Sequence, residues 1–498
     1  MVPVGTWEVT NMSHSVKKNF LWNASYQLLL VLAPLVTTPY LSRVLGAEQV
    51  GVYSYTYAVT NYFALFATMG MASYGVRVIA ACGEDRGERS RVFWSAYASQ
   101  LCIALPVALA YIGYLLLGNP EGGALVAWVW GLWVLSCALD VSWLFFGVED
   151  FRMPTERSFV TKLASIVAIF LWVKESEDLW LYCLAIASSY FANQVIMWPF
   201  VRRHVDWTRP SWREIKRHFV PNLRLFAPVV AISLYTSLSK IMLGSISGMS
   251  QAGFYEYSEK ISKMPMAVIT ALGTVMLPRM TAALSSGRES EAKHLLGESM
   301  WAMQAVAMGM TFGIAAVAPE FSAVFFGPGY DPCATVMPIV AVVIPIISAS
   351  NVIGVQYLLP TFSDVPYTAS VCVGAVVNIA LNLILLEPLG AVGAAITTVA
   401  AELAVLLYQC HAVRKELPLA SYLRGALPFV GAGALMYALV RMVAAALGEV
   451  SVAGLAIEIC AGIVVYAAIS LVWCLFYQRE RLEAVSYTHL TLPTILLV

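Results

Sequence analysis

The sequence GAEQVGVYSY at residues 46–55 returns 202 residues later as GMSQAGFYEY at residues 248–257. The identical positions are two glycines, one glutamine and two tyrosines, so a shared apolar character does not by itself explain the match. Upstream, Leu-Ser-Arg at 41–43 corresponds to Leu-Ser-Lys at 238–240. Internal repeats of this kind are typical of membrane transporters, so we interpret the chain as two related halves.

Long apolar blocks flank both copies of the repeat. Of the 498 residues, 59% are hydrophobic and 12% are charged, which is about half of the charged share of an ordinary soluble domain. The blocks reach the length of about 20 residues that one helix needs to cross a bilayer. This composition excludes a soluble multidomain protein. Lys17 and Lys18 precede a block that continues as a full span without a small-residue cleavage site, so we expect no cleaved signal peptide.

We therefore predict an all-α integral membrane protein with about fourteen transmembrane helices. The charges support this number, because with both termini in the cytoplasm 24 of the 30 lysines and arginines fall in inside segments and 3 lie near outer ends. One missed span would invert every later loop and remove this asymmetry. The predicted spans are 19–45, 50–76, 92–117, 124–147, 159–173, 179–201, 225–246, 253–284, 300–318, 335–358, 368–386, 392–412, 426–447 and 452–476.

The offset between the repeat copies covers six predicted spans, an even number, so both halves cross the membrane in the same orientation. We expect two pseudo-symmetric six-helix lobes, related by an axis along the membrane normal, with a cavity between them and two extra C-terminal helices. The expected domains are an N-lobe at 12–207, a C-lobe at 208–411 and a helix pair at 412–478. Residues 1–11 and 485–498 lie outside these domains, and we expect them to be non-native or disordered.

Several motifs follow one another in the order DVSWLFFGVE at 140–149, FFG at 325–327, NVIGVQYLLP at 351–360, the segment from Asn378 to Asn382, and GAVGAA at 390–395 followed by Glu402. In order and spacing they resemble polysaccharide repeat-unit flippases of the Wzx type, within the multidrug, oligosaccharidyl-lipid and polysaccharide exporter superfamily. The resemblance covers about residues 12–478. The chain departs from this pattern at Ser239, where such flippases often have an aspartate beside the lysine.

The resemblance implies a flippase of the bacterial cytoplasmic membrane that moves an undecaprenyl-pyrophosphate-linked oligosaccharide between leaflets, for capsule or O-polysaccharide biosynthesis. The lobes would rock in alternating access, with the glycan in the cavity and the lipid tail in the bilayer. Polysaccharide polymerase or assembly proteins are the expected partners. The alternatives are a cation-coupled multidrug exporter, a lipid II flippase and, less favoured, a membrane glycan polymerase or ligase.

Enzyme and cofactor motifs are absent from the sequence. The nine cysteines include no CxxC pair and form no ligand cluster with the six histidines, so we expect no metal site. No P-loop or dinucleotide fingerprint occurs, so we expect a transporter without a cofactor, and active transport would use an H+ or Na+ gradient. The basic loop at 202–224 faces anionic lipid under the predicted orientation, which explains its charge without nucleic acid.

The eighth predicted span carries four charged residues on one helix face, namely Glu256, Glu259, Lys260 and Lys263. Each glutamate precedes a lysine by four residues, which is the favourable order for an ion pair on a helix. Two interpretations remain open. The ammonium groups attract a lipid pyrophosphate or acidic sugars in a hydrated cavity, or the four residues pair with one another at the outer interface.

Other candidates are less specific. The repeat-related Arg43 and Lys240 either line the outer mouth of the cavity or extend to the lipid headgroups. Tyr53 is a candidate sugar platform, although packing or an interfacial belt is the commoner role of such a tyrosine. The remaining polar residues within spans are secondary candidates: Asn23, Asp140, Gln356, Asn378, Asn382 and Glu402. For Asn378 and Asn382 the alternative is hydrogen bonding across a helix interface. For Asp140 the alternative is a capping or pairing role near the inner end of its span.

Overall fold

The computed structural model describes the backbone of residues 6–118, 123–361 and 363–477. It describes side chains from residue 29 onward, apart from residues 31, 227–228, 231–232, 234–235, 275 and 364. The candidate Asn23 therefore lies outside the described side chains, and so do most of the two ends that the sequence sets apart. Within the described residues every regular element is a helix, as predicted for an all-α protein.

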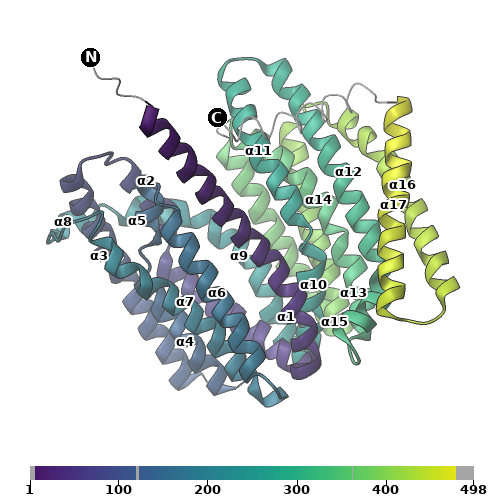
Figure 1. Ribbon diagram of the computed structural model, residues 1–498, viewed down its shortest axis with the longest axis horizontal. Helices are drawn as coiled ribbons and strands as arrows, with labels where there is room; N and C mark the ends of the chain where they lie inside the picture. Colours follow the sequence, from purple (N-terminus) through teal and green to yellow (C-terminus); the bar gives the residue numbers. More distant parts are fainter. Residues whose placement is uncertain (1–5, 119–122, 362, 478–498) are drawn as a thin grey trace. The chain divides into compact units, whose positions relative to one another are not determined.

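The chain forms two compact units, residues 1–245 and 246–498, each of which has its own apolar core. In the first unit, α4 packs against α3 and α7, and α7 also packs against α6 (Figure 1). Its helices are α1 (Thr6–Thr68), α2 (Met71–Ala80), α3 (Arg86–Leu117), α4 (Ala124–Ala138), α5 (Ser142–Gly147), α6 (Arg152–Trp172), the short 3-10 helix η1 (Ser176–Asp178), α7 (Leu179–Val201), α8 (Trp212–Lys216) and α9 (Phe219–Ser247), whose last turn reaches the second unit.

The second unit is organised around α12, which contacts α11, α13, α14, α16 and α17. Its elements are α10 (Met249–Lys263), α11 (Met266–Ser285), α12 (Glu289–Phe321), the π-helix η2 (Ser322–Phe326), α13 (Asp331–Ala341), α14 (Val343–Ser350), the π-helix η3 (Asn351–Leu358), α15 (Asp364–Val413), α16 (Leu419–Leu447) and α17 (Val452–Tyr477). The assignment of six helices to each lobe and two to a C-terminal pair stays a prediction.

Ten segments of the described chain are long and apolar enough to cross a membrane. Two of them, Leu32–Ala80 and Val365–Val413, are 49 residues long, more than twice the ~20 residues that one crossing takes. Each contains a glycine with non-helical backbone, Gly46 or Gly390, at which the helix changes direction. The chain is therefore a multi-pass membrane protein, and the number fourteen stays a prediction.

The predicted eighth span is not one helix. It is divided at Met264 and Pro265 into α10 and α11. Proline lacks the N–H that would bond the preceding turn, and its ring clashes with the carbonyl four residues earlier. The charged residues lie on α10, whereas the apolar candidate span begins at Met266. A sequence window centred on hydropathy merged these two helices.

The repeat has the same local geometry in both units. Gly46 has φ 74° and ψ 169°, and Gly248 has φ 96° and ψ 161°. Each glycine joins the helix before it to the helix that carries the GxxQxGxYxY tyrosines. Backbone with positive φ and ψ near 165° is accessible essentially to glycine alone. The repeat therefore preserves a turn, and the sequence match reflects that turn.

We expect Gly46→Ala and Gly248→Ala each to lower the free energy of unfolding by about 1–3 kcal/mol. Nothing lies within 4 Å of a Cβ at either position, so the cost arises from the backbone alone. Asparagine variants should be destabilised as well. Asparagine tolerates the left-handed helical region, but the ψ angle at these two positions lies outside that region. Gly113→Ala in α3, equally open but helical, is the matched control, and thermal unfolding in detergent is the measurement. Equal stability of the Gly46 and Gly113 variants would contradict this account.

Candidate functional site

A cluster of buried charges lies between α10 and α15 in the second unit. The Lys263 ammonium contacts Oε1 of Glu259 at 2.8 Å, one helical turn away, so the ion pair that the spacing predicted is present. The Tyr255 hydroxyl lies 3.4 Å from the same carboxylate oxygen and 2.8 Å from the Thr398 hydroxyl on α15. Glu402, one turn after Thr398 and 6% exposed, interacts electrostatically with both Lys263 and Glu259.

The charges of this cluster do not balance when all three groups are ionised, since two carboxylates face one ammonium. A buried net charge is costly in a low-dielectric interior, so such a cluster favours the uptake of a proton or another cation. The same ammonium can pair with an anionic ligand if a carboxylate releases it. The four-residue ladder of the sequence thus forms part of a site whose second half comes from α15.

The other two charges of α10 lie at its half-buried surface. The Lys260 ammonium lies over the ring of Tyr257, 5.9 Å from its centroid, and Glu256 is half-buried one turn earlier. Whether they line a cavity stays a prediction.

Two asparagines on α15 form a polar ladder in the second unit. Asn382 donates from Nδ2 to Oδ1 of Asn378 at 3.0 Å and accepts from the Thr397 hydroxyl at 2.6 Å. All three side chains are fully buried. Since Asn382 precedes the bend at Gly390 and Thr397 follows it, the bond between them connects the two arms of α15. This is bonding across a helix interface, the alternative that the sequence left open.

Gln356 lies on the π-helix η3 and is also fully buried. Its Oε1 accepts from the Ser299 hydroxyl of α12 at 2.7 Å, and its Nε2 donates to Oδ1 of Asn351 at 3.3 Å. A π-helix is rare and often marks a functional position. Here it turns the Gln356 amide toward α12, so a helical wheel drawn at 3.6 residues per turn would misplace it.

Tyr53 belongs to an aromatic cluster in the first unit. Its ring centroid lies 4.9 Å from that of Tyr182 on α7 and 5.7 Å from that of Tyr57, and Tyr57 stacks on Trp133 of α4 at 4.8 Å. Trp130 fills the base of the cluster, with its indole N–H donated to the Thr56 hydroxyl. Tyr53, Tyr57 and Trp133 are only half-buried. The cluster therefore combines tight packing with accessible ring surface.

The structure gives the remaining candidates local roles or exposed positions. Asp140 accepts from the backbone N–H and the hydroxyl of Ser142 at 2.9 Å and 2.6 Å, a local contact in the turn before α5. Arg43 is exposed and donates to the Pro39 carbonyl one turn earlier at 2.7 Å. Lys240 is half-buried on α9. A role of Arg43 and Lys240 in substrate binding stays a prediction.

A buried histidine connects three segments at the loop end of the first unit. His218 is 2% exposed, lies 2.7 Å from the Tyr74 hydroxyl through Nδ1 and lies 2.9 Å from the Ser95 hydroxyl through Nε2. Ser95 donates its own hydrogen to the Val92 carbonyl, so it accepts from His218, and the ring proton belongs on Nε2. Burial, assisted by the positive charge of Arg217, lowers the pKa of His218 to about 4.

Acidification is therefore expected to destabilise the first unit. Between pH 6.5, the ordinary pKa of histidine, and about 4, the unfolded chain binds a proton at this residue and the folded chain does not, so the free energy of unfolding falls as pH falls. At pH 5 the loss reaches about 2 kcal/mol relative to pH 7.5. Thermal unfolding across this range measures it, with His218→Gln as the variant that should show a flatter pH dependence. An equal slope in both proteins would exclude His218 as the cause.

Three residues of these polar clusters escaped the sequence analysis. Tyr255 is the repeat equivalent of Tyr53, and that alignment could have identified it. Thr397 and Thr398 carry no sequence signal, because threonine in an apolar span usually bonds its own backbone. In the part of the chain that the structure describes, no group of three or more metal-ligand side chains comes together.

Comparisons with known proteins agree with this architecture. A family model described as polysaccharide biosynthesis protein matches residues 16–284, more than half of the chain. An Escherichia coli (strain K12) protein named "Putative O-antigen transporter" is 25% identical over 416 residues, which cover 81% of this chain and 97% of that protein.

Among solved structures, a lipid II flippase in its inward closed conformation has a TM-score of 0.70 at 16% identity. The match covers 93% of this chain and 99% of the flippase chain. An inward-facing multidrug resistance transporter of the MATE family, in the same superfamily, has a TM-score of 0.63 at 14% identity, covering 82% and 98%. At such identities the structural likeness shows a shared transporter fold.

Proposed function

The chain belongs to the polysaccharide biosynthesis protein family, whose members include membrane transporters, and from this premise we propose that it is a flippase for undecaprenyl-pyrophosphate-linked oligosaccharides. It moves them from the cytoplasmic to the outer leaflet of the bacterial cytoplasmic membrane for capsule or O-polysaccharide biosynthesis. The observation that carries this proposal is the cluster of Lys263 with Glu259 and Glu402, because a partly buried ammonium that is already paired with a carboxylate is a ready partner for pyrophosphate.

The cluster supports an exchange of partners. In the structure the Lys263 ammonium contacts Glu259 at 2.8 Å. An arriving pyrophosphate competes for that ammonium, and the released carboxylate is neutralised by a proton or cation. Departure of the pyrophosphate restores the ion pair. Binding of an anion and uptake of a cation are thereby linked at one site, so translocation should depend on the H+ or Na+ concentration.

The aromatic cluster of the first unit supports a role in binding the glycan. The half-exposed rings of Tyr53, Tyr57 and Trp133 present adjoining faces from α1 and α4. The C–H face of a pyranose packs on such rings, whereas its hydroxyl edge remains hydrated. Stacking of this kind tolerates different sugars, so the cluster suits a transporter of complex repeat units.

The direct experiment is a leaflet-accessibility assay with purified protein in liposomes. A fluorescent undecaprenyl-pyrophosphate-linked oligosaccharide is placed in both leaflets, and a membrane-impermeant reagent reports the fraction that becomes accessible. Wild-type protein should expose the inner pool, and empty liposomes should not. No exposure by a correctly folded wild-type protein, with or without an imposed H+ or Na+ gradient, would overturn the proposal.

Lipid II is the second candidate substrate, because the lipid II flippase shares the fold over 93% of this chain. It carries the same lipid pyrophosphate with a different head, so the charged cluster suits both molecules. The same assay with fluorescent lipid II decides between them. Faster translocation of lipid II than of the oligosaccharide would assign the protein to peptidoglycan precursors instead.

A further inference from the structure

A pocket with three tryptophan walls opens at the loop end of the first unit. Trp94 of α3, Trp198 of α7 and Trp207 of the following loop line it together with Arg202 and Asp206, and it has a volume of 880 Å³. That volume is in the range of small-molecule binding sites. None of these residues belongs to the aromatic cluster around Tyr53.

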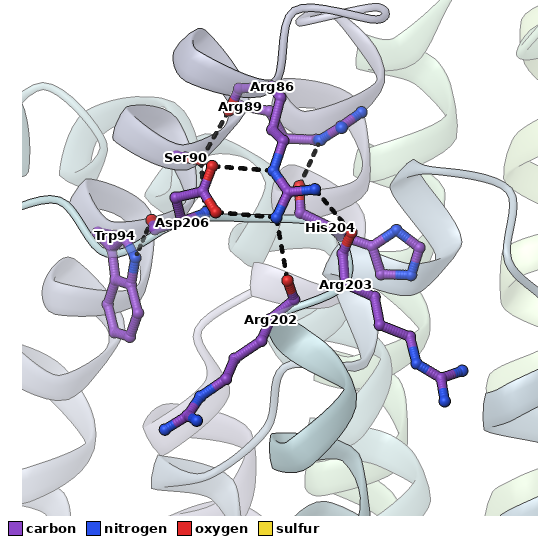
Figure 2. A network of polar contacts seen from close by, with 8 residues as sticks. All are labelled: Arg86, Arg89, Ser90, Trp94, Arg202, Arg203, His204 and Asp206. Atoms are coloured by element: carbon purple, nitrogen blue, oxygen red, sulfur yellow. Dashed lines mark hydrogen bonds and ion pairs between the residues drawn. The ribbon is translucent and has the colours of Figure 1, made fainter.

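The loop wall of the pocket is held by a dense polar network (Figure 2). Arg86, at the start of α3, binds both carboxylate oxygens of Asp206 at 2.9 Å and 2.8 Å, and it donates to the backbone carbonyls of Arg202 and Arg203. Ser90 accepts from the Asp206 amide at 2.9 Å, and Arg89 donates to the His204 carbonyl at 3.1 Å. A loop with this many bonds to one helix is preorganised, so the pocket exists before any ligand arrives.

The network also decides which groups the pocket offers to a ligand. The indole N–H of Trp94 is donated to the Asp206 carbonyl at 2.9 Å, and that of Trp198 to the Leu139 carbonyl at 3.1 Å. The rings therefore present faces and edges, and those of Trp94 and Trp207 stand at 70° with centroids 4.3 Å apart. The bidentate pair with Arg86 holds the pKa of Asp206 below its usual range.

Arg202 provides the charge of the pocket. Its exposed guanidinium points away from Asp206 (Figure 2), whose carboxylate is already bound by Arg86. This guanidinium would repel a cationic ligand. The carboxylate on the other wall would not compensate, because Arg86 already binds it. An anionic ligand would find a strong, charge-assisted donor beside two apolar ring faces.

We propose that this pocket binds a sugar phosphate, with one pyranose packed on the indole faces and its phosphate on Arg202. The apolar C–H face of a sugar packs on an indole ring, and the guanidinium donates hydrogen bonds to the phosphate dianion. An acyl chain fits poorly, because the pocket extends past the end of α7 at Val201 into the polar loop. Interfacial tryptophans of a membrane belt need neither a shared pocket nor an ordered loop.

The proposal rests on the proposed function and adds a loading step to it. The loops at this end of the first unit carry Arg86, Arg89, Arg202 and Arg203, which mark it as the cytoplasmic end under the positive-inside rule. Lipid-linked glycans are presented from that side. The pocket would hold the sugar phosphate region of the substrate at the membrane surface before the glycan enters the translocation path.

Binding is tested on the full chain in nanodiscs by saturation-transfer NMR with three probes: glucose 1-phosphate, galactose 1-phosphate and N-acetylglucosamine 1-phosphate. At least one should bind with saturation of its ring C–H protons. Trp207→Ala should weaken that probe about tenfold, and Arg202→Gln about fivefold. Trp207 is 74% exposed, so its removal should leave the fold intact. Trp212→Ala and Arg213→Gln, exposed and outside the pocket, are the matched controls.

Failure of all three probes to bind, or binding that Trp207→Ala leaves unchanged, overturns the inference. Trp207-dependent binding of dihexanoyl phosphatidylglycerol in place of the sugar phosphates also overturns it, because the occupant is then a phospholipid headgroup. In the liposome assay Trp207→Ala should raise KM and leave kcat unchanged. Binding needs no transport, so a wild-type protein that binds but does not translocate contradicts the proposed function and leaves the pocket assigned.

Discussion

Lys263→Met is expected to abolish transport and to destabilise the second unit. The substitution removes the ammonium that contacts Glu259 at 2.8 Å and that acts on Glu402. Loss of one partner of a buried ion pair typically costs about 3–5 kcal/mol, because the remaining charge has no compensation. Transport should fall at least about a hundredfold, since the anion loses its buried partner. Thermal unfolding and the liposome assay measure the two effects separately.

The chain contains a matched control for this variant. Lys293 and Glu289 have the same four-residue spacing in α12 and lie 3.7 Å apart, but they are exposed. Lys293→Met should change stability by less than about 0.5 kcal/mol and leave transport intact. Lys263→Arg keeps the charge and should retain part of the activity.

A double variant separates stability from function. Glu259→Gln combined with Lys263→Met removes both charges of the pair, so stability should largely recover. Transport should remain absent, because the ammonium is still missing. A double variant that recovers both would show that the pair is structural, and normal transport by Lys263→Met alone would remove the cluster from the mechanism.

Gly433→Val is expected to prevent stable packing of α16 on α12. A Cβ at Gly433 would lie 2.8 Å from Cγ of Phe312 and closer still to Cδ2, so the base of the ring blocks it. That ring cannot swing aside as a flexible side chain would, and the helices must separate. Overpacking of this kind typically costs about 1–3 kcal/mol for small additions, and a branched side chain should exceed that range. Gly433→Ala should show a smaller loss in the same direction.

The control lies two residues away on the same helix. Nothing is within 4 Å of a Cβ at Gly431, which is exposed, so Gly431→Val should leave folding unaffected apart from a small propensity change. Size-exclusion profiles and proteolysis of α16 and α17 in detergent report the packing. A Gly433→Val protein with wild-type stability would show that α16 does not approach α12 as closely as the structure describes.

Local patterns in the sequence predicted several features that the structure bears out. The helical class follows from apolar blocks, and the Glu259–Lys263 pair follows from a spacing of four residues on a helix. The repeat identified Gly46 and Gly248 as equivalent, and both have the same unusual backbone. The resemblance to polysaccharide flippases is confirmed by the family match.

Other features depend on residues that are far apart in the chain. Glu402 and Thr398 join the α10 cluster only because α15 packs against α10, and no spacing in the sequence relates them. The same holds for Trp94, Trp198 and Trp207, which form a pocket because Arg86 holds the loop against α3. The proline at position 265 could have predicted the division between α10 and α11, but hydropathy averaged over a window merged the two helices.

By itself, the sequence determined that this protein is a multi-pass helical membrane protein with an internal repeat, because hydropathy, helical periodicity and glycine turns are properties of neighbouring residues. Only the tertiary structure decided which buried charges share a site, which asparagines connect the arms of α15 and where a tryptophan pocket forms. These features depend on which helix faces meet, and the packing free energy that selects those faces is summed over residues hundreds of positions apart.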